Sequence, residues 1–488
     1  MQEWIEMELQ SSDLGDERLD ERFKIVLDRL SQKPSVSIPA ACNGWSETIA
    51  AYRFFDNPRV EPDDVLAPHF DATLNRIAEQ NVVLLIQDTT EIDVTRPDEQ
   101  MKGAGPLNDE SRVGFYDHAM LAMTPERIPL GVVDANIWAR DEETFRENQK
   151  DKKAKKRKQR QQPIEAKESF RWLQGYRRGC EIADQVPETK VVVVSDSEGD
   201  IFECFAEALP EAGERKAQWL VRACQDRSLS SEQEQNLWAQ VSASEVIGTM
   251  EVAVSKNEPR SHDDRKRKQP RSARTATLTI QATRVTLSGP RRAGCGKLPD
   301  VTVNAVLVRE TSTPPNGEEP IQWLLLTSLP IKSFKQVCLI IDYYSCRWQI
   351  EIYFRVLKSG CRVEELQLET AERFQPCLAL YMIVAWRVMY ALMMGRACPE
   401  ASCELIFSED EWKAVYTVAA QAPPPETPPT IEEMVYLIAS LGGHLGRTHD
   451  GPPGPKTMWI GMQRMTDLAL AWRTFGPKNT KTRRKICV

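Results

Sequence analysis

Two short, unbroken apolar runs constrain the fold of this chain more than any other feature. Val82–Ile86 (VVLLI) and Val191–Val194 (VVVV) contain no polar position, so neither has the alternating pattern of a strand with one face in water. Each run is followed by one polar residue and then an aspartate, Asp88 and Asp196. Strands that are buried on both faces belong to sheets covered by helices. We therefore expect an α/β fold, a mixed sheet flanked by helices.

The pattern along the chain predicts three segments. Residues 1–65 have a helical pattern and form the expected N-terminal domain. Residues 66–369 carry the α/β pattern, with an insertion at about 226–323 in which short alternating runs are separated by basic or Pro/Gly-rich turns. Residues 370–488 are mostly helical. We therefore expect an α/β core with a β-strand insertion, together with helical N-terminal and C-terminal domains.

The longest apolar stretch, Cys377–Gly395, is nearly long enough to span a membrane. Its single charge, Arg387, lies near the middle, where insertion into a bilayer costs about 2.5–3.5 kcal/mol. The sequence has no second stretch of comparable length. We therefore expect a helix buried in a protein core, and no membrane partner.

Charge is distributed unevenly along the chain. The formal net charge is -8, so the overall charge does not by itself indicate a nucleic-acid binder. Two local clusters are strongly basic, Lys150–Arg160 and Arg260–Arg274. Runs of like charge are more often solvated loops than binding surfaces, so each cluster favours a nucleic-acid partner only weakly.

The cysteines indicate a reducing compartment. They include no CxxC pair and no Cys/His array with the spacing of a zinc site. The first residues, MQEWIE, have no basic segment followed by an apolar one, so we expect no secretory signal. Together these features predict a cytoplasmic protein.

Asp88 and Asp196 share one local pattern, an apolar run, one polar residue, the aspartate, and then Thr or Ser. If the two strands lie side by side, both carboxylates emerge at one edge of the sheet, where sites of α/β proteins tend to form. Carboxylate oxygens are the ligands that Mg²⁺ prefers. The alternative is that each aspartate is a turn or helix-cap residue, the usual role of Asp after a strand.

A third acidic residue lies in a polar stripe of a predicted helix over Phe334–Gly360. Tyr344, Arg347, Glu351 and Lys358 fall within an arc of about 60° on a helix of 100° per residue. The other residues around them are heavily apolar, so this helix is expected to be largely buried. Buried charges must be paired or bind a metal. An internal ion pair between Arg347 and Glu351, four residues apart, is the alternative to a site.

These four residues carry a resemblance to a known family. Their spacing, Tyr-(2)-Arg-(3)-Glu-(6)-Lys, resembles the signature of the Tn-five-type cut-and-paste DDE transposases, members of the insertion-sequence-four family. The likeness continues through further motifs that occur in the same order, namely Leu14-Gly-Asp16, Ala51-Tyr-Arg-Phe54, Asp88-Thr-Thr90, Lys167-Glu-Ser169, Trp323–Ser328 and Leu441-Gly-Gly443.

The resemblance implies an RNase H-like catalytic domain in which Asp88, Asp196 and Glu351 are the catalytic acids and bind two Mg²⁺ ions, with Mn²⁺ able to substitute. One ion would activate the attacking water or 3′-hydroxyl, and the other would stabilise the leaving oxygen. Enzymes of this family nick one strand at each transposon end, form and reopen a DNA hairpin, and join the 3′-hydroxyl ends to target DNA.

The resemblance also implies contacts to double-stranded DNA. Tyr344, Arg347 and Lys358 would hold phosphates near the cleavage site, and Trp323 would stack on a flipped base. Core packing in an apolar strand is the alternative role for Trp323. The other candidate DNA contacts are Arg18, Arg22, Tyr52, Arg53 and Arg222. For the N-terminal four, ordinary surface charge with one packed tyrosine is the alternative.

The partners that the resemblance implies are the inverted-repeat ends of a transposon, target DNA, and a second copy of the chain in a synaptic complex, associated with a bacterial nucleoid. Two other functions remain open. The first is an RNase H-like nuclease that cuts DNA without transferring strands. The second is a catalytically silent DNA-binding protein derived from a transposase.

Overall fold

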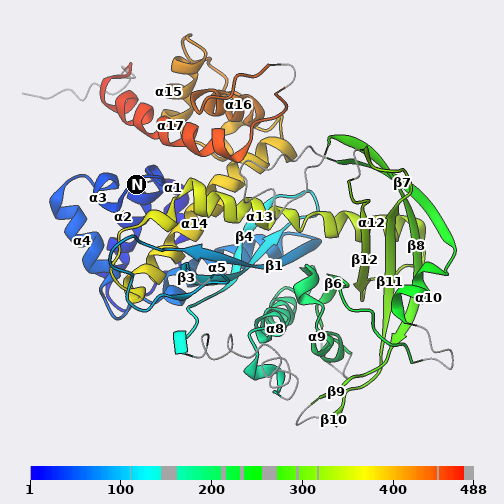
Figure 1. Ribbon diagram of the computed structural model, residues 1–488. Helices are drawn as coiled ribbons and strands as arrows, with labels where there is room; N and C mark the ends of the chain where they lie inside the picture. The colour runs from blue at the N-terminus through cyan, green and yellow to red at the C-terminus, as the bar shows by residue number, and fades with distance from the viewer. Residues whose placement is uncertain are drawn as a thin grey trace, which may run out of the picture. The chain divides into compact units, whose positions relative to one another are not determined.

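The chain divides into two compact units in the computed structural model (Figure 1). We call them the helix-rich unit (Met1–Gln80, Thr89–Arg146 and Trp348–Val488) and the sheet-rich unit (Asn81–Asp88 and Glu147–Arg347). The structure describes all residues except 1, 110, 144, 146–161, 210–215, 231–235, 255–271, 293–295, 316–317, 448–449 and 478–488. The basic cluster Lys150–Arg160 and most of Arg260–Arg274 lie outside the described residues.

The sheet-rich unit is built on the strands that the apolar runs predict. The first part of β1 (Val82–Asp93) pairs in parallel with β5 (Lys190–Ser195), which pairs in parallel with β6 (Gln218–Arg222). Val83, Leu84, Leu85 and Ile86 of β1 are fully buried, and the apolar residues of β5 are nearly so. Both runs are thus strands buried on both faces, and the prediction of a mixed α/β sheet is confirmed.

Antiparallel strands extend this sheet beyond β6. Next to β6 lies β12 (Gln322–Thr327), followed in order by β11 (Val301–Glu310), β8 (Arg274–Leu287) and β7 (Val246–Val254). A separate two-stranded hairpin joins β9 (Arg291–Arg292) to β10 (Gly296–Lys297). The strands from β7 to β11 correspond to the predicted β insertion.

Short helices complete the sheet-rich unit. They are η1 (Ile164–Ala166), α8 (Phe170–Gln185), η2 (Ser197–Gly199), α9 (Phe202–Glu207), α10 (Leu237–Ser242) and α12 (Phe334–Ser345). Helix α8 packs against β5, and this packing depends on Gly179. A Cβ atom at Gly179 would lie 2.4 Å from Cγ2 of Val193, so any side chain there would push the helix off the strand.

The prediction of one continuous helix over Phe334–Gly360 is wrong. Helix α12 ends at Ser345, two turn residues follow, and α13 (Trp348–Arg355) runs on into a π-helical turn, η4 (Val356–Gly360). The break falls where the chain passes from the sheet-rich to the helix-rich unit. The polar stripe is therefore divided, with Tyr344 on α12, Arg347 in the turn itself, and Glu351 and Lys358 after the turn.

The helix-rich unit contains the N-terminal helices, three antiparallel strands of the sheet in which β3 neighbours β1, and the C-terminal helices. Strand β3 (Val113–Met123) pairs with β2 (Gly105–Pro106) and β4 (Pro129–Trp138), and Val94 after β1 bonds to Val113 at the start of β3. The helices are α1 (Glu3–Glu8), α2 (Glu17–Gln32), α3 (Ile38–Ala41), α4 (Trp45–Phe55), α5 (Pro62–Ala78), η5 (Val363–Glu365), α14 (Ala371–Ala397), η6 (Cys403–Leu405), α15 (Glu409–Ala419), α16 (Ile431–Leu441) and α17 (Pro455–Phe475). The helical N-terminal and C-terminal segments agree with the expected fold.

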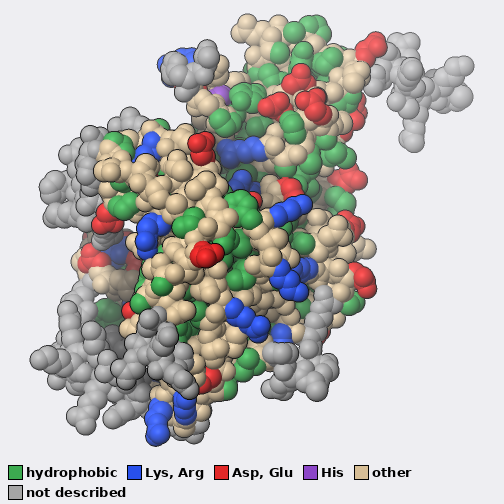
Figure 2. Space-filling model, turned by 90° about the vertical axis from the view of Figure 1, so that its right-hand side faces the viewer, with side chains coloured by type: hydrophobic (Ala, Val, Ile, Leu, Met, Phe, Trp, Pro, Cys, Tyr) green, Lys and Arg blue, Asp and Glu red, His purple; other side chains and the backbone are tan. Residues whose placement is uncertain are grey.

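Figure 2 shows one face of the molecule, with side chains coloured by type. Lys and Arg side chains stand singly or in small groups there, among uncharged side chains. Among the described residues on this face they form no continuous basic surface. Because the net charge is -8, attraction of a polyanion to this face would depend on local groups of cations rather than on the field of the whole chain.

Helix α14 contains the apolar stretch that resembles a membrane span. It is the one described helix that is long and apolar enough to cross a membrane, and most of its apolar length is buried within the protein. Its neighbours include α5, β4 and α16. The prediction of a core helix in this stretch is confirmed.

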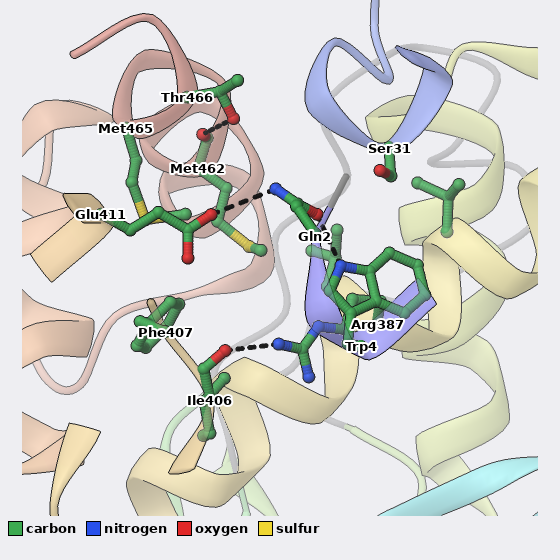
Figure 3. Close-up of a pocket in the computed structure, with 12 residues that line it drawn as sticks. Gln2, Trp4, Ser31, Arg387, Ile406, Phe407, Glu411, Met462, Met465 and Thr466 are labelled. Carbon is green, nitrogen blue, oxygen red and sulfur yellow. Dashed lines mark hydrogen bonds between the residues drawn. The ribbon is translucent and has the colours of Figure 1, made fainter. Parts of the chain in front are cut away.

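Arg387, the charge within that helix, is half-buried and has specific partners. Its guanidinium donates to the carbonyl oxygen of Ile406 and lies 5.3 Å from the ring centroid of Trp4 (Figure 3). Gln2, at the N-terminal end of α1, donates to Oε1 of Glu411 at 3.1 Å and accepts from the Trp4 indole. A cavity of about 30 Å³ remains among these side chains. The start of the chain is thereby joined to its C-terminal helices.

A buried polar group joins α1 to α5 and β4. Glu8 accepts from Nη1 and Nη2 of Arg76 at 2.9 and 3.0 Å and contacts Nδ1 of His69. The N–H of Val132 donates to Nε2 of His69 at 2.9 Å, so Nδ1 carries the proton and donates to Glu8. Burial would raise the pKa of Glu8, but His69 and Arg76 outweigh it and lower that pKa to about 2.

We predict that Glu8→Gln lowers the free energy of unfolding by about 3 kcal/mol at pH 7, because Arg76 loses its buried partner. The ordinary pKa of Glu8 is 4.5 and its folded value is about 2. Its contribution is therefore complete above pH 4.5 and is lost as the pH falls toward 2. Urea unfolding at pH 7 and pH 4 should show that the difference in the free energy of unfolding between wild type and variant is smaller at pH 4. Glu3→Gln, an exposed glutamate of the same helix, is the control; an equal effect from it would contradict the prediction.

Candidate functional site

The register of two parallel strands brings Asp88 and Asp196 to the same edge of the sheet. The last paired residues are Ile86 of β1 and Val194 of β5. Asp88 lies two residues beyond Ile86, and Asp196 lies two residues beyond Val194. The two aspartates therefore occupy equivalent positions just beyond the paired segment of the two parallel strands, Asp88 within β1, which runs on to Asp93, and Asp196 directly after the end of β5.

Asp196 begins the short helix η2. Its Oδ1 atom accepts from the backbone N–H of Glu198 at 2.7 Å, the contact of an N-cap residue. The helix-cap role, which was the alternative to a metal site in the sequence analysis, is therefore present at Asp196. It leaves Asp196 with further acceptor capacity, since a carboxylate has about four lone-pair positions.

A second aspartate, Asp200, holds the loop after Asp196 in place. Its side chain is fully buried, and Oδ2 accepts from the N–H groups of Cys224 and Gln225, each at 2.9 Å. Arg227 donates to Oδ1 through Nε at 3.2 Å and Nη2 at 2.6 Å. Because all four contacts join the loop after β5 to the segment after β6, Asp200 is a structural residue whose oxygens are already engaged.

Arg347 lies against Asp88 within the sheet-rich unit. Its Nη1 atom is 3.3 Å from Oδ2 of Asp88, and the two side chains are 7% and 17% exposed. The pKa of Tyr344 is raised chiefly by burial, while Arg347 and Arg222 lower it and Asp196 raises it. The structure thus brings Asp88, Asp196, Tyr344, Arg347 and Arg222 into one electrostatic neighbourhood.

Trp323 borders the same group. It lies on β12 opposite Val308, and its ring is 5.8 Å from that of Tyr344, edge to face. Trp323 is half-buried, unlike Leu324, Leu325 and Leu326, which follow it and are buried. Arg222, at the end of β6, is exposed. An aromatic ring and a cation are therefore both accessible beside the carboxylates.

Glu351 and Lys358 belong to the helix-rich unit. Glu351 is half-buried in the first turn of α13. Lys358 lies in the π-helical turn η4, a feature often found at functional sites. Its Nζ atom donates to the carbonyl oxygen of Glu91 at 2.7 Å and pairs with Glu364 at 3.3 Å. Glu364 also accepts from the N–H of Asp93 at 3.0 Å, so Lys358 is held beside the end of β1.

The donor set at the sheet edge suits a hard divalent cation. Asp88 and Asp196 offer carboxylate oxygens, the ligand type that Mg²⁺ requires. Among the described residues, no group of three or more His, Cys, Asp or Glu side chains is arranged to hold a metal ion. Two acids come together within the sheet-rich unit, and the role of Glu351 as the third ligand stays a prediction.

A groove lies between α2 and α4 in the helix-rich unit, with a volume of about 800 Å³. Three of the predicted DNA contacts, Arg18, Arg22 and Arg53, line it. Tyr52 does not; it is half-buried, and its pKa is raised chiefly by burial and also by Cys377 and Cys42. Three of the four predicted N-terminal contacts therefore line one groove, and Tyr52 lies outside it. Contact of all four residues with DNA stays a prediction.

Several residues of these two regions were not singled out from the sequence. Arg227 carries no pattern that distinguishes it from a surface arginine, because its importance depends on the burial of Asp200. Trp45 and Arg59 line the N-terminal groove. The exposure of Trp45 could have been anticipated only if the orientation of α4 were known.

The chain matches three models of protein families. Residues 1–60 match a model described as transposase DNA-binding, residues 204–386 match a transposase DDE domain, and residues 383–474 match the transposase Tn5 dimerisation domain. The DDE-domain match includes Glu351 and begins after Asp88 and Asp196. It identifies the α/β core as RNase H-like.

Among solved structures, the chain is similar to the piggyBac transposase in a synaptic complex with hairpin DNA. The identity is 10% and the TM-score 0.34, over 94% of this chain and 73% of that one. That TM-score is too low to support any inference about this chain.

We predict that Arg227→Leu lowers the free energy of unfolding by about 3–5 kcal/mol, because it leaves the buried Asp200 carboxylate without its cation. Asp200→Asn combined with Arg227→Leu should recover part of this loss, since the buried charge is then absent. Arg178→Leu, which breaks a pair with the exposed Glu181, should cost less than about 1 kcal/mol. Thermal and urea unfolding of the four proteins would measure these differences. No recovery in the double variant would show that charge is not the cause.

Proposed function

This chain belongs to the Tn-five-type DDE transposases, and from that premise we propose that it cuts and joins DNA at the ends of its own transposable element. The chain is a DNA transposase by its DNA-binding and DDE-domain matches. We propose further that it hydrolyses one strand at each end, forms a hairpin by transesterification, and transfers the 3′-hydroxyl ends to target DNA. Mg²⁺ is the proposed cofactor.

The observation that carries this proposal is the equivalent position of Asp88 and Asp196, each two residues beyond the last paired residues of two neighbouring parallel strands. Phosphodiester chemistry requires carboxylates that share divalent cations, with cations of the protein beside them to hold phosphates. Arg347 contacts Asp88, and Tyr344 is influenced electrostatically by Asp196, Arg347 and Arg222. This combination is what distinguishes the edge from an ordinary pair of capping residues.

We propose that Asp88, Asp196 and Glu351 are the acids that hold two Mg²⁺ ions. When bound, such ions activate the attacking oxygen and stabilise the leaving oxygen of an in-line displacement. Asp200 is excluded from this set, because its two oxygens are already engaged by four donors in a fully buried position.

Arg347 has a defined part in the proposal. Its guanidinium contacts Asp88 in the DNA-free protein at 3.3 Å. A DNA phosphate offers arginine a bidentate partner of higher charge density. Transfer of Arg347 from Asp88 to a phosphate would remove this cation from Oδ2 of Asp88. Binding of a phosphate by Arg347 is thereby coupled to release of the Asp88 carboxylate from Arg347.

Trp323 and Tyr344 suit the distorted DNA end that a hairpin demands. The 3′-hydroxyl formed by the first cut must reach the phosphate of the opposite strand, form a new P–O bond there and release the flanking DNA. Such an approach requires an unstacked base near the end, and stacking on an aromatic ring offsets that cost by about 1–3 kcal/mol. The half-buried Trp323 offers such a ring.

The proposed partners are the two inverted-repeat ends, target DNA and a second copy of the chain. The match to a dimerisation domain over residues 383–474 supports the homodimer. Inverted repeats in the DNA that flanks the coding sequence would supply the substrate for direct tests. A cytoplasmic, nucleoid-associated location remains part of the proposal.

We predict that Asp88→Asn, Asp196→Asn and Glu351→Gln each abolish cleavage of DNA carrying these ends, while end binding is retained. Cleavage by the wild type should require Mg²⁺ and stop on chelation, as denaturing gels that resolve nicks and hairpins would show. Glu365→Gln, which removes an exposed carboxylate paired with Arg362, is the matched control and should cleave normally. Wild-type cleavage by any of the three acid variants would remove that residue from the proposed set. Nicks without strand transfer by the wild type would favour the nuclease alternative.

We predict that Trp323→Ala reduces hairpin formation by about 10-fold or more while the first nick proceeds, because loss of base stacking of about 1–3 kcal/mol affects only the distorted state. Trp323→Phe should restore most of the activity. Time courses of nick and hairpin on the same gels would separate the two steps. An equal loss of both steps in Trp323→Ala, with lowered thermal stability, would show instead that Trp323 serves core packing.

A further inference from the structure

Strand β1 loses one of its two neighbours just before Asp88. In the sheet, β1 lies between β3 and β5. Its pairing with β5 ends at Ile86, whereas β1 itself runs on to Asp93. Asp88 therefore lies in a part of the strand that has left the register with β5. Restraint on this part of β1 has to come from the side of β3 or from side-chain contacts.

A side-chain contact joins β1 to β3 at the residue after Asp88. Oγ1 of Thr89 and Nδ1 of His118, a residue of β3, are joined by a hydrogen bond of 2.9 Å. His118 is 3% exposed, and Thr89 is half-buried. Breaking such a bond leaves a desolvated polar group without its partner, which is costly. The contact is thus a firm connection between the two strands.

The Thr89 side chain passes this restraint on to the main chain. Threonine is branched at Cβ, so few rotamers are open to it in a strand, and a bond through Oγ1 selects one of them. Asp88 and Thr89 share a planar peptide group, so the orientation of one limits that of the other. Side chains alternate along a strand, which puts the two on opposite faces. His118 therefore acts from behind the strand and does not itself reach a ligand of Asp88.

The two aspartates of the candidate site are restrained in different ways. Oδ1 of Asp196 accepts from the N–H of Glu198, so this carboxylate is oriented directly. Oδ2 of Asp88 meets Arg347, and in the proposed function this contact gives way to a phosphate. The orientation of Asp88 then depends more on the strand that carries it, and the contact between Thr89 and His118 fixes that strand.

We propose that His118 is a positioning residue for Asp88 and acts through the hydroxyl of Thr89. This inference rests on the proposed role of Asp88 as a ligand of divalent metal ions, and it adds the residues that hold this ligand in place. Site residues must be kept within about 0.5 Å of their productive positions. Substitution of groups that orient metal ligands typically lowers metal affinity or activity by about 10- to 100-fold. Loss of the bond between Thr89 and His118 therefore weakens metal binding although every ligand is still present.

A contact that served only the stability of the sheet would have a different signature. Its loss would lower the temperature of unfolding and leave the metal affinity of the folded protein unchanged. Loss of positioning lowers that affinity at temperatures where the variant is fully folded. Metal affinity measured on folded protein therefore separates the two roles.

The test measures Mn²⁺ binding to the full chain in complex with a pre-cleaved transposon-end duplex, which offers no bond to hydrolyse. Free Mn²⁺ gives an electron paramagnetic resonance signal that is lost on binding, and the duplex alone is the reference. Asp88→Asn sets the level of binding that does not depend on the site. Circular dichroism and thermal unfolding establish that each variant is folded at the temperature of the measurement.

The variants separate the contact from the shape of the two side chains. Thr89→Val removes the hydroxyl and keeps the branched shape, and His118→Leu removes the ring nitrogens. Thr89→Ser and His118→Asn keep a polar atom near the position of the lost contact, so they test for rescue. Thr283→Val, at a half-buried threonine of β8, is the matched control.

Thr89→Val and His118→Leu should each raise the dissociation constant of site-bound Mn²⁺ by about 10- to 100-fold. The Mg²⁺ concentration for half-maximal cleavage of DNA carrying the ends should rise by a similar factor, and cleavage should recover at high Mg²⁺. Thr89→Ser and His118→Asn should retain most of the wild-type affinity, and Thr283→Val should match it.

Unchanged Mn²⁺ affinity in folded Thr89→Val would overturn the inference, even if His118→Leu does not fold. A lowered temperature of unfolding with unchanged affinity would assign the contact to sheet stability and overturn it as well. Both outcomes leave the proposed function standing. A wild type that binds no more Mn²⁺ than Asp88→Asn would overturn the proposed metal site, and this inference with it.

Discussion

The parallel pairing of β1 with β5 is the interaction on which the candidate site depends. Both strands are buried on both faces, so a slip in register would place polar residues in the sheet interior and apolar ones at its edge. The register is therefore set by hydrophobic burial, and the positions of Asp88 and Asp196 follow from it. Two carboxylates at one edge would repel each other, and the guanidinium of Arg347 against Asp88 offsets that repulsion in the DNA-free protein.

The ion pairs around this edge differ in what surrounds them. Asp200 is fully buried, and Arg227 and two backbone N–H groups engage both of its oxygens, so the pair fixes a loop. Asp88 is partly exposed and meets Arg347 at 3.3 Å. Lys358 and Glu364 are each 29% exposed. Breaking a pair whose carboxylate keeps contact with water costs less than breaking one whose carboxylate is fully buried. The fully buried Asp200 therefore stabilises the loop beside the site, whereas the more exposed Asp88 and Lys358 can contact a ligand.

In the helix-rich unit, parts of the chain that are distant in sequence pack around one apolar helix. Helix α14 is packed on most of its length, and its one central charge, Arg387, contacts the Ile406 carbonyl and lies over the Trp4 ring. Glu8, His69 and Arg76 form a second polar group nearby in the same unit, over which Trp386 of α14 lies. The N-terminal helices are consequently anchored on their inner side, and their outer side is left for α4 to present Trp45 and Arg53.

The sequence by itself determined the α/β class, the buried strands and the two aspartates, the helical ends and the apolar helix, because each depends on local periodicity or on a run of one residue type. The family signature, a fixed spacing of residues along the sequence, identified Glu351, Arg347 and Lys358 as candidate site residues. Only the tertiary structure decided that the stripe is broken after Ser345, that Arg347 contacts Asp88, that Asp200 is committed to Arg227, and that Trp45 and Arg59 rather than Tyr52 line the groove. These outcomes depend on which elements become neighbours, and residue spacing within one element carries no information about its partners across the fold.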